Sequence, residues 1–163
     1  MRFASRVWRH VPASAQTLHV GFILRSGGRW NRRGRYGALY TALTPEGALA
    51  EYRKYFRQRN MTGRPQTPHD LVSIEVDLHP VLDLTDPANG IVDPQAPFLT
   101  GDSDEDKDQC HALADAIRAA GYVAVIVPSA AEKGQKNLVI YIDGPAQQIA
   151  LDDGPDRIPI ECS

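Results

Sequence analysis

The sequence predicts a mixed α+β domain, and three observations support this fold class. The chain has 163 residues, a length typical of one domain, so we expect residues 1–163 to fold as a single unit. Segments that resemble strands and helices follow one another in an irregular order, unlike the regular alternation of a doubly wound fold. The segment Tyr122–Val127 is almost continuously apolar, which is typical of a central strand buried on both faces.

The N-terminal half contains three segments with a clear pattern and one ambiguous segment. Arg6–Val11 is expected to form a strand, whereas Leu18–Leu24 fits either a strand or the start of a helix. A short strand is predicted over Tyr36–Leu43. Thr44 then has the character of an N-cap, with proline at the first helical position, and predicts a helix from Pro45 to about Arg59.

The C-terminal half begins after a loop predicted over residues 60–69. Two short strands are expected within Asp70–Leu84, followed by a loop-dominated segment, Thr85–Asp108. The acidic cluster within that segment fits either a solvated surface or the entry to the next helix, and it lacks the glycine and glutamate of a calcium loop. The remaining expected elements are a helix over Asp108–Ala120, a strand over Leu138–Ile142 that pairs with Tyr122–Val127, and late edge strands at Ile149–Leu151 and Ile158–Ile160.

Composition is that of an ordinary globular protein, with 42% hydrophobic and 23% charged residues. No apolar run approaches the ~20 residues that a membrane span requires, and the N-terminus lacks the apolar core of a secretory signal. The two cysteines, Cys110 and Cys162, form no metal-binding spacing. We therefore expect a cytoplasmic protein without a membrane association and without a metal.

The charges are divided unevenly along the chain. Residues 1–64 contain 13 basic and two acidic residues, a net charge of +11, while residues 65–163 contain five basic and 18 acidic residues, a net charge of −13. This asymmetry fits a basic face that attracts an anion, and it equally fits two halves that pack against each other.

Four residues stand out as candidates for binding and catalysis. Arg29 follows a glycine pair, and its rigid, permanently charged guanidinium suits a pyrophosphate. Tyr40 on the following strand offers a flat ring for stacking. Glu51 is a carboxylate on the otherwise apolar side of its helix, and Ser129 ends the buried strand, where it equally fits a turn.

The order of these motifs resembles the RES domain family. The resemblance rests on Gly-Gly-Arg-Trp-Asn at residues 27–31, Ala-Leu-Tyr-Thr-Ala at 38–42, Ala-Leu-Ala-Glu at 48–51 and the strand that leads to Ser129. The pairs Ala124-Val125 and Ala130-Ala131 depart from the family's pattern. The resemblance implies a fold similar to ADP-ribosyltransferases, with two packed, mostly antiparallel sheets and flanking helices around an NAD cleft.

The same resemblance implies the toxin of a toxin–antitoxin pair that consumes NAD+, with no metal. Catalysis would fall to Glu51, Arg29 and Ser129, and NAD+ binding to Arg29, Asn31, Tyr40 and Ser129. The expected partner is a cognate Xre-like helix-turn-helix antitoxin, through which nucleic acid would be contacted only indirectly. Whether water, phosphate or a protein accepts the ADP-ribosyl group stays open.

Two alternatives belong to other classes of protein. The basic N-terminal half fits a module that binds nucleic acid without NAD chemistry, although its aromatic residues are not interleaved with basic ones. A non-catalytic interaction subunit would show neither activity.

Overall fold

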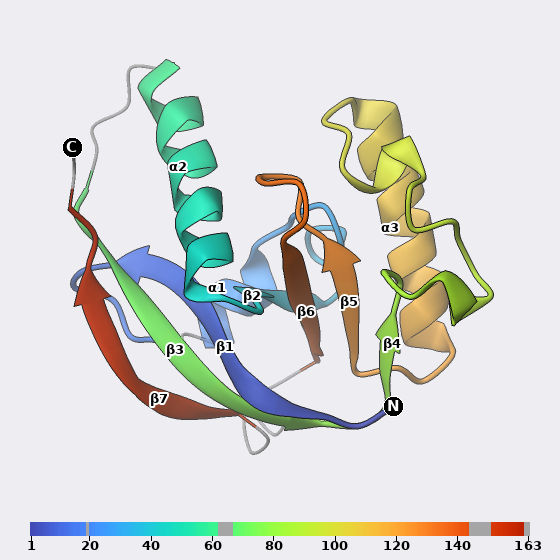
Figure 1. The fold of residues 1–163 in the computed structure, drawn as a ribbon, viewed down its shortest axis with the longest axis horizontal. Coiled ribbons are helices and arrows are strands. Elements are labelled where there is room, and N and C mark those ends of the chain that lie inside the picture. The colour runs from blue at the N-terminus through green and yellow to red at the C-terminus, as the bar shows by residue number, and fades with distance from the viewer. Residues whose placement is uncertain (19, 62–66, 144–150, 162–163) are drawn as a thin grey trace.

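The computed structural model describes residues 1–18, 20–61, 67–143 and 151–161. Its strands form one seven-stranded sheet in the order β4-β5-β6-β2-β1-β3-β7 (Figure 1). The elements are β1 (Phe3–Pro12), α1 (Val20–Arg25), β2 (Gly37–Ala42), α2 (Pro45–Met61), β3 (His69–Leu78), β4 (Val81–Asp83), the 3₁₀ turns η1 (Pro87–Asn89) and η2 (Pro97–Leu99), α3 (Asp104–Ala119), β5 (Ala124–Pro128), β6 (Lys136–Ile142) and β7 (Leu151–Pro159). The mixed α+β class is confirmed.

The sheet is antiparallel except at one edge, where β4 runs parallel to β5. Parallel neighbours need a long crossover, and the segment from η1 through α3 provides it. The predicted pairing of Leu138–Ile142 with the apolar strand is confirmed, because β5 and β6 pair with Val125 opposite Val139.

The expectation of two separate packed sheets is not met, since the seven strands form one sheet. Its two halves, β4-β5-β6-β2 and β1-β3-β7, are joined where Trp8 of β1 pairs with Ala42 of β2. The long strands β1 and β3 pair over ten residues, and in Figure 1 they curve from the base of β4 beneath β5 and β6 toward the opposite side of the molecule. A strongly twisted sheet can therefore fold back on itself and bury an inner face while its hydrogen bonding stays continuous.

The core lies on both faces of the central strands, as the apolar sequence of β5 requires. On one face Ala124 and Ile126 pack in a cluster with Val7 of β1, Ile74 of β3 and Ile23 of α1. On the other face the alternate residues of β5 pack against α3, whose buried residues are Cys110, Ala114 and Ile117. The inward curl of β1 and β3 thus covers one face and α3 covers the other.

Both long helices begin where a side chain caps them. The Thr44 hydroxyl accepts a hydrogen bond from the Gly47 amide at 3.0 Å, which confirms the predicted start of α2. The expected start of α3 at Asp108 is wrong by one turn. Ser103 is the N-cap, its hydroxyl accepts from the Asp106 amide, and Asp106 reciprocates in a capping box. The acidic cluster is therefore a helix entry, where negative charge stabilises the positive end of the helix dipole.

The structure decides the form of two other segments. The ambiguous Leu18–Leu24 segment contributes a helix, α1, in place of a strand. The two late strands are one strand, β7, while Ile149 and Ala150 lie outside the described residues. The Gly154-Pro155 pair does not end it, because β7 is an edge strand with a register shift opposite Ser73, whose hydroxyl accepts from the Asp156 amide.

Among the described residues, no helix combines the length and the apolar character needed to cross a membrane.

Candidate active site

A cleft of about 360 Å³, lined by charged and aromatic residues, lies beside the central strands. Its walls include Arg29 from the loop before β2, Tyr40 from β2, Glu51 and Lys54 from α2, and Asn137 from β6. In Figure 1 the hairpin between β5 and β6 lies between α2 and α3, which stand apart on either side of it. The fold therefore brings two of the three predicted catalytic residues, Arg29 and Glu51, into one cleft, and the third contacts its wall.

The Glu51 carboxylate is held by two donors from distant parts of the chain. The Ser129 hydroxyl donates to Glu51 Oε1 at 3.0 Å, and the Asn137 amide donates to the same oxygen at 2.8 Å. Within the described residues the second oxygen, Oε2, has no hydrogen-bond partner. One oxygen thus fixes the orientation of the carboxylate, and the other is available to a ligand.

Ser129 has two structural roles at once. Its hydroxyl accepts hydrogen bonds from the amides of Ala131 and Glu132 at 3.1 and 3.2 Å, as a turn serine would, while its proton goes to Glu51. The residue is only 5% exposed. The turn that follows β5 therefore aims the hydroxyl at α2.

A second wall is built by the loop that carries the glycine pair. The Tyr40 hydroxyl accepts from the Trp30 amide at 2.9 Å and donates to Asn31 Oδ1 at 2.6 Å, and burial raises the pKa of this phenol. A Cβ at Gly28 would lie 2.6 Å from the Tyr40 oxygen, so only glycine permits this approach. His111 of α3 also contacts this loop, with Nε2 2.7 Å from the Gly28 carbonyl oxygen.

Asn31 supports the loop from inside the protein. The residue is 1% exposed, and its side-chain amide donates to the carbonyl oxygens of Ser26 and Tyr36 at 2.9 and 3.1 Å. Together with the hydrogen bond from Tyr40, these contacts use both the nitrogen and the oxygen of the side-chain amide. Asn31 therefore positions Arg29 and Tyr40 and offers no exposed group to a ligand in this structure.

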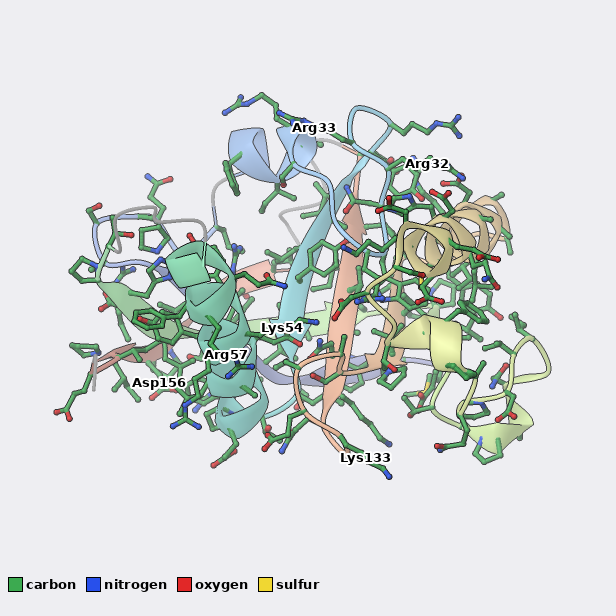
Figure 2. All side chains as sticks on the ribbon, turned by 90° about the horizontal axis from the view of Figure 1, so that it is seen from above. Arg32, Arg33, Lys54, Arg57, Lys133 and Asp156 are labelled. Atoms are coloured by element: carbon green, nitrogen blue, oxygen red, sulfur yellow. The ribbon has the colours of Figure 1, made fainter. Side chains whose placement is uncertain are left out.

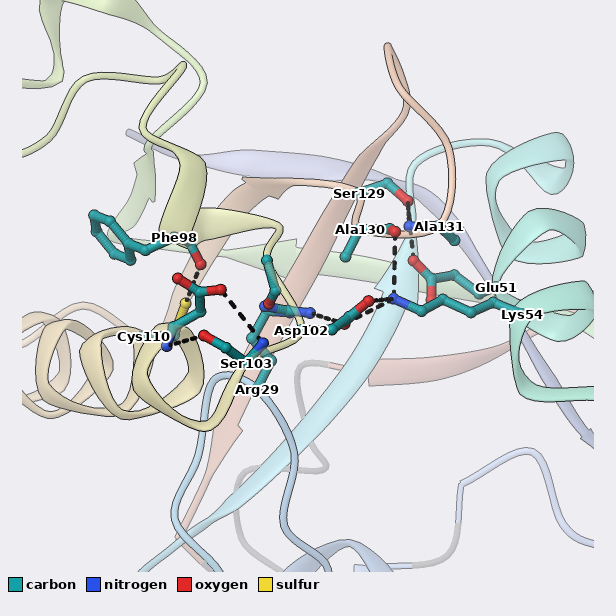
Figure 3. Close-up of polar contacts among 12 residues, drawn as sticks. Arg29, Glu51, Lys54, Phe98, Asp102, Ser103, Cys110, Ser129, Ala130 and Ala131 are labelled. Atoms are coloured by element: carbon teal, nitrogen blue, oxygen red, sulfur yellow. Dashed lines mark hydrogen bonds and ion pairs between the residues drawn. The ribbon is translucent and has the colours of Figure 1, made fainter. Parts of the chain in front are cut away.

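Arg29 and Lys54 face each other across the cleft and share one acid (Figure 3). Asp102, in the segment between η2 and α3, accepts from Arg29 at 2.8 Å and from Lys54 at 3.1 and 3.2 Å. Each cation also donates to a backbone carbonyl oxygen, Arg29 to Gly101 and Lys54 to Ala130. Burial alone would raise the pKa of Asp102, but the hydrogen bonds and charges of Lys54 and Arg29 outweigh it and lower this pKa.

The basic turn after Arg29 is directed away from the cleft. Arg32 and Arg35 pair with Asp115 of α3 at 3.2 and 3.5 Å, and the Tyr36 hydroxyl donates to the same carboxylate at 2.6 Å. Arg33 points outward at the edge of the molecule in Figure 2. Of the arginines in this stretch, Arg29 is therefore the one that lines the cleft.

A smaller hollow of about 230 Å³ lies behind Tyr40 and also reaches Glu51. It is lined in part by Arg9 and His10, and burial lowers the pKa of Arg9 to about 10. His10 Nδ1 lies 3.0 Å from His69 Nδ1, so one ring donates and the other accepts. Burial, assisted by the charges of His69 and Arg9, lowers the pKa of His10 to about 3, and His10 is neutral at physiological pH.

Sequence reasoning missed three residues of this site: Lys54, Asn137 and Asp102. Lys54 carries a signal that could have found it, because it lies three residues after Glu51 and so shares its helix face. Asn137 and Asp102 lie 86 and 73 residues from their partners Glu51 and Arg29, and nothing local marks them.

Fold and cleft together define an α+β domain with one mainly antiparallel sheet and a cleft that combines the carboxylates of Glu51 and Asp102 with cations that include Arg29, Lys54 and Lys107. The family model described as the RES domain matches residues 6–157, and the chain belongs to this family. A chain of the crystal structure of the M. tuberculosis MbcT–MbcA toxin–antitoxin complex has a similar fold, with a TM-score of 0.68 and 24% identity, over 98% of this chain and 85% of that one. Comparison with curated protein sequences found no match.

Proposed function

We propose that this protein is the toxin of a toxin–antitoxin pair and that it breaks the bond between nicotinamide and ribose in NAD+. The observation that carries the proposal is the Glu51 carboxylate, which is oriented by Ser129 and Asn137 in a cleft that also contains Arg29. Membership of the RES family and the similar fold found in a toxin–antitoxin complex support it. We further propose that the curled sheet is a variant of the ADP-ribosyltransferase-like fold.

The residue types suit this chemistry. Breaking the bond between nicotinamide and ribose develops positive charge on the ribose, as in an oxocarbenium ion. A fixed carboxylate stabilises that charge, and Glu51 has Oε2 free of other hydrogen bonds within the described residues. Arg29 would hold the phosphates and Tyr40 would line the nicotinamide side. Nicotinamide leaves a cationic precursor as a neutral molecule, so the proposed reaction uses no metal.

The test is to incubate the purified protein with NAD+, with and without phosphate and cell extract, and to identify the products by mass. We expect free nicotinamide in at least one condition. Free ADP-ribose would identify water as the acceptor, a phosphorylated ADP-ribose would identify phosphate, and a modified polypeptide would identify a protein. Intact NAD+ in every condition, with a folded protein, would overturn the proposal.

A toxin of this kind requires a partner that restrains it. We propose a cognate antitoxin with an Xre-like helix-turn-helix part, encoded beside this chain. Expression of this chain alone should arrest growth, and co-expression of the neighbouring gene should relieve the arrest. Normal growth at a high level of the lone protein would contradict the toxin role.

The contacts argue against the alternative of a nucleic-acid-binding module. Among the residues that the structure describes, seven ion pairs join a basic residue of the first 64 residues to an acidic residue of the remainder: Arg2–Asp77, Arg6–Glu75, Arg6–Asp156, Arg29–Asp102, Arg32–Asp115, Arg35–Asp115 and Lys54–Asp102. These pairs involve six of the 13 basic residues of the N-terminal segment, so the uneven charge distribution is in part matched across the fold. Steeply salt-dependent RNA or DNA binding, with NAD+ left intact, would favour the alternative.

A further inference from the structure

Two cations of the cleft are much less exposed than the acid that pairs with both of them. The side chains of Arg29 and Lys54 are 13% and 19% exposed, whereas that of Asp102 is 59% exposed. Burying a cation is costly unless an anion is close. The cations are thus fixed parts of the cleft wall, while the acid reaches them from the surface.

Each cation is also held by the backbone, so its position does not depend on Asp102 alone. Arg29 donates to the Gly101 carbonyl oxygen and Lys54 to the Ala130 carbonyl oxygen. Ala130 follows Ser129, so Lys54 and Glu51 reach the same turn from one face of α2. Figure 2 shows Lys54 extending from α2 toward the middle of the molecule, while Lys133 points outward.

We infer that Arg29 and Lys54 together form the binding site for a diphosphate group, and that the Asp102 carboxylate occupies this site until a ligand displaces it. The inference deepens the proposed function, because it rests on a dinucleotide being the ligand of the cleft. It adds Lys54 as a ligand-contacting residue and Asp102 as an internal competitor.

The charges match this assignment. A dinucleotide carries one negative charge on each of two phosphates. Arg29 and Lys54 present two positive charges from opposite walls of the cleft, which the exposed Lys107 also lines. The single carboxylate of Asp102 now bridges both cations, at 2.8 Å from Arg29 and 3.1 Å from Lys54. Because its side chain is largely exposed, Asp102 can turn to solvent without opening the core. Charge-assisted bonds from Arg and Lys are the usual means of holding phosphate oxygens.

An internal competitor leaves the site free in only a fraction of the protein molecules. The apparent affinity for the ligand is reduced in proportion to that fraction. The probe is ADP-ribose, which has the diphosphate but no nicotinamide, and its binding is measured by calorimetry. Asp102→Asn removes the competing charge, and Asp104→Asn is its matched control, an exposed acid two residues away. Lys54→Met removes one cation, and its control is Arg53→Met, on the same helix but lining a different groove.

We expect Asp102→Asn to bind ADP-ribose on the order of tenfold more tightly than the parent and than Asp104→Asn. Lys54→Met should bind on the order of tenfold more weakly than Arg53→Met. Adenosine, which lacks phosphate, should bind all five proteins equally. Circular dichroism checks folding, and Asp102→Ser and Lys54→Gln replace any variant that does not fold.

Equal or weaker binding by Asp102→Asn relative to Asp104→Asn would overturn the internal competitor. Unchanged binding by Lys54→Met, or no binding of ADP-ribose by any of the proteins, would overturn the diphosphate site. These results are independent of NAD+ turnover. If the affinities follow the expected order but NAD+ is not consumed, only the proposed function is contradicted. If NAD+ is consumed but the affinities do not follow that order, only this inference is contradicted.

Discussion

The Ser129 hydroxyl donates a hydrogen bond of 3.0 Å to the Glu51 carboxylate across 78 residues of sequence. This bond joins the turn after β5 to helix α2, and the Asn137 amide approaches the same oxygen from β6. Three elements thus fix one carboxylate at the wall of the cleft. The first two predictions concern this arrangement, and the others concern the loop and the buried histidine beside it.

The first prediction concerns Glu51→Gln, which removes the negative charge but keeps the shape of the side chain. The glutamine oxygen can still accept from Ser129 and Asn137, while its amide takes the place of Oε2. We expect turnover of NAD+ to fall on the order of 10²–10³-fold, the usual loss of one electrostatic contribution. The dissociation constant for NAD+ and the melting temperature should change little.

The control is Glu46→Gln, an exposed acid on the first turn of the same helix. It should turn over NAD+ at the parent rate. Product formation followed by mass gives kcat, and calorimetry with the inactive variant gives the affinity. A folded Glu51→Gln protein with parental turnover would remove Glu51 from the proposed mechanism.

The second prediction concerns Asn137→Asp, which places a second carboxylate in contact with Glu51. The present amide-to-carboxylate distance is 2.8 Å. Two carboxylates this close cannot both ionise, so one of them must hold a proton and its pKa rises. We expect the acidic limb of the pH–rate profile to move upward by about one pH unit or more. Asn137→Ala, which removes the donor without adding a negative charge, should lower the rate and move that limb by less than Asn137→Asp does.

The third prediction concerns Tyr40→Phe and the loop that carries Arg29. Loss of the hydroxyl leaves the Trp30 amide and Asn31 Oδ1 without their partner, and such unsatisfied buried groups typically cost about 1–3 kcal/mol. We expect that loss in the free energy of unfolding measured with urea. Tyr122→Phe is the control, because no hydrogen bond of the Tyr122 hydroxyl occurs among the described residues. Equal stability of the two variants would contradict the role of Tyr40.

A fourth prediction tests the same contact from the opposite side. In Gly28→Ala the new Cβ would lie 2.6 Å from the Tyr40 oxygen and 2.7 Å from its ring carbon Cζ. Because this is below any normal contact distance, the tyrosine or the loop must move. We expect a loss of stability of about 1–3 kcal/mol together with weaker binding of NAD+. Parental affinity in a folded Gly28→Ala protein would show that the loop does not position Arg29.

The fifth prediction concerns the pH dependence of stability through His10. Its pKa is lowered by burial to about 3 in the folded protein, compared with about 6.5 in an unfolded chain. The unfolded state therefore binds the proton more readily. Stability from this group is fully present above pH 6.5 and is lost as the pH falls toward 3. Between pH 7 and pH 5 the loss is about 2 kcal/mol.

Urea unfolding of the parent and of His10→Asn at several pH values measures this effect. Asparagine keeps a polar atom near His69 Nδ1 but does not titrate, so the slope between pH 7 and pH 5 should become shallower. An unchanged slope in His10→Asn would show that His10 takes up its proton equally in both states.

The sequence by itself determined the elements whose signals are local. The unbroken apolar run of β5 indicated a central strand, and Thr44-Pro45 marked the start of α2, because neighbouring residues alone decide these features. The residue types of Arg29 and Glu51 likewise indicated a place for a ligand. The start of α3 is also encoded locally, in the Ser103 capping box, although the sequence analysis places Ser103 within a loop-dominated segment.

The tertiary structure alone decided which of these residues meet. Neither the Ser129–Glu51 bond nor the bridge of Asp102 between Arg29 and Lys54 has a local signal, since each depends on how distant strands pair. The single continuous sheet depends on the junction of Trp8 with Ala42, which no periodicity predicts. Local patterns record the conformational preferences of neighbouring residues. The site is built from contacts between distant residues, which form only when the strands pair in their final register.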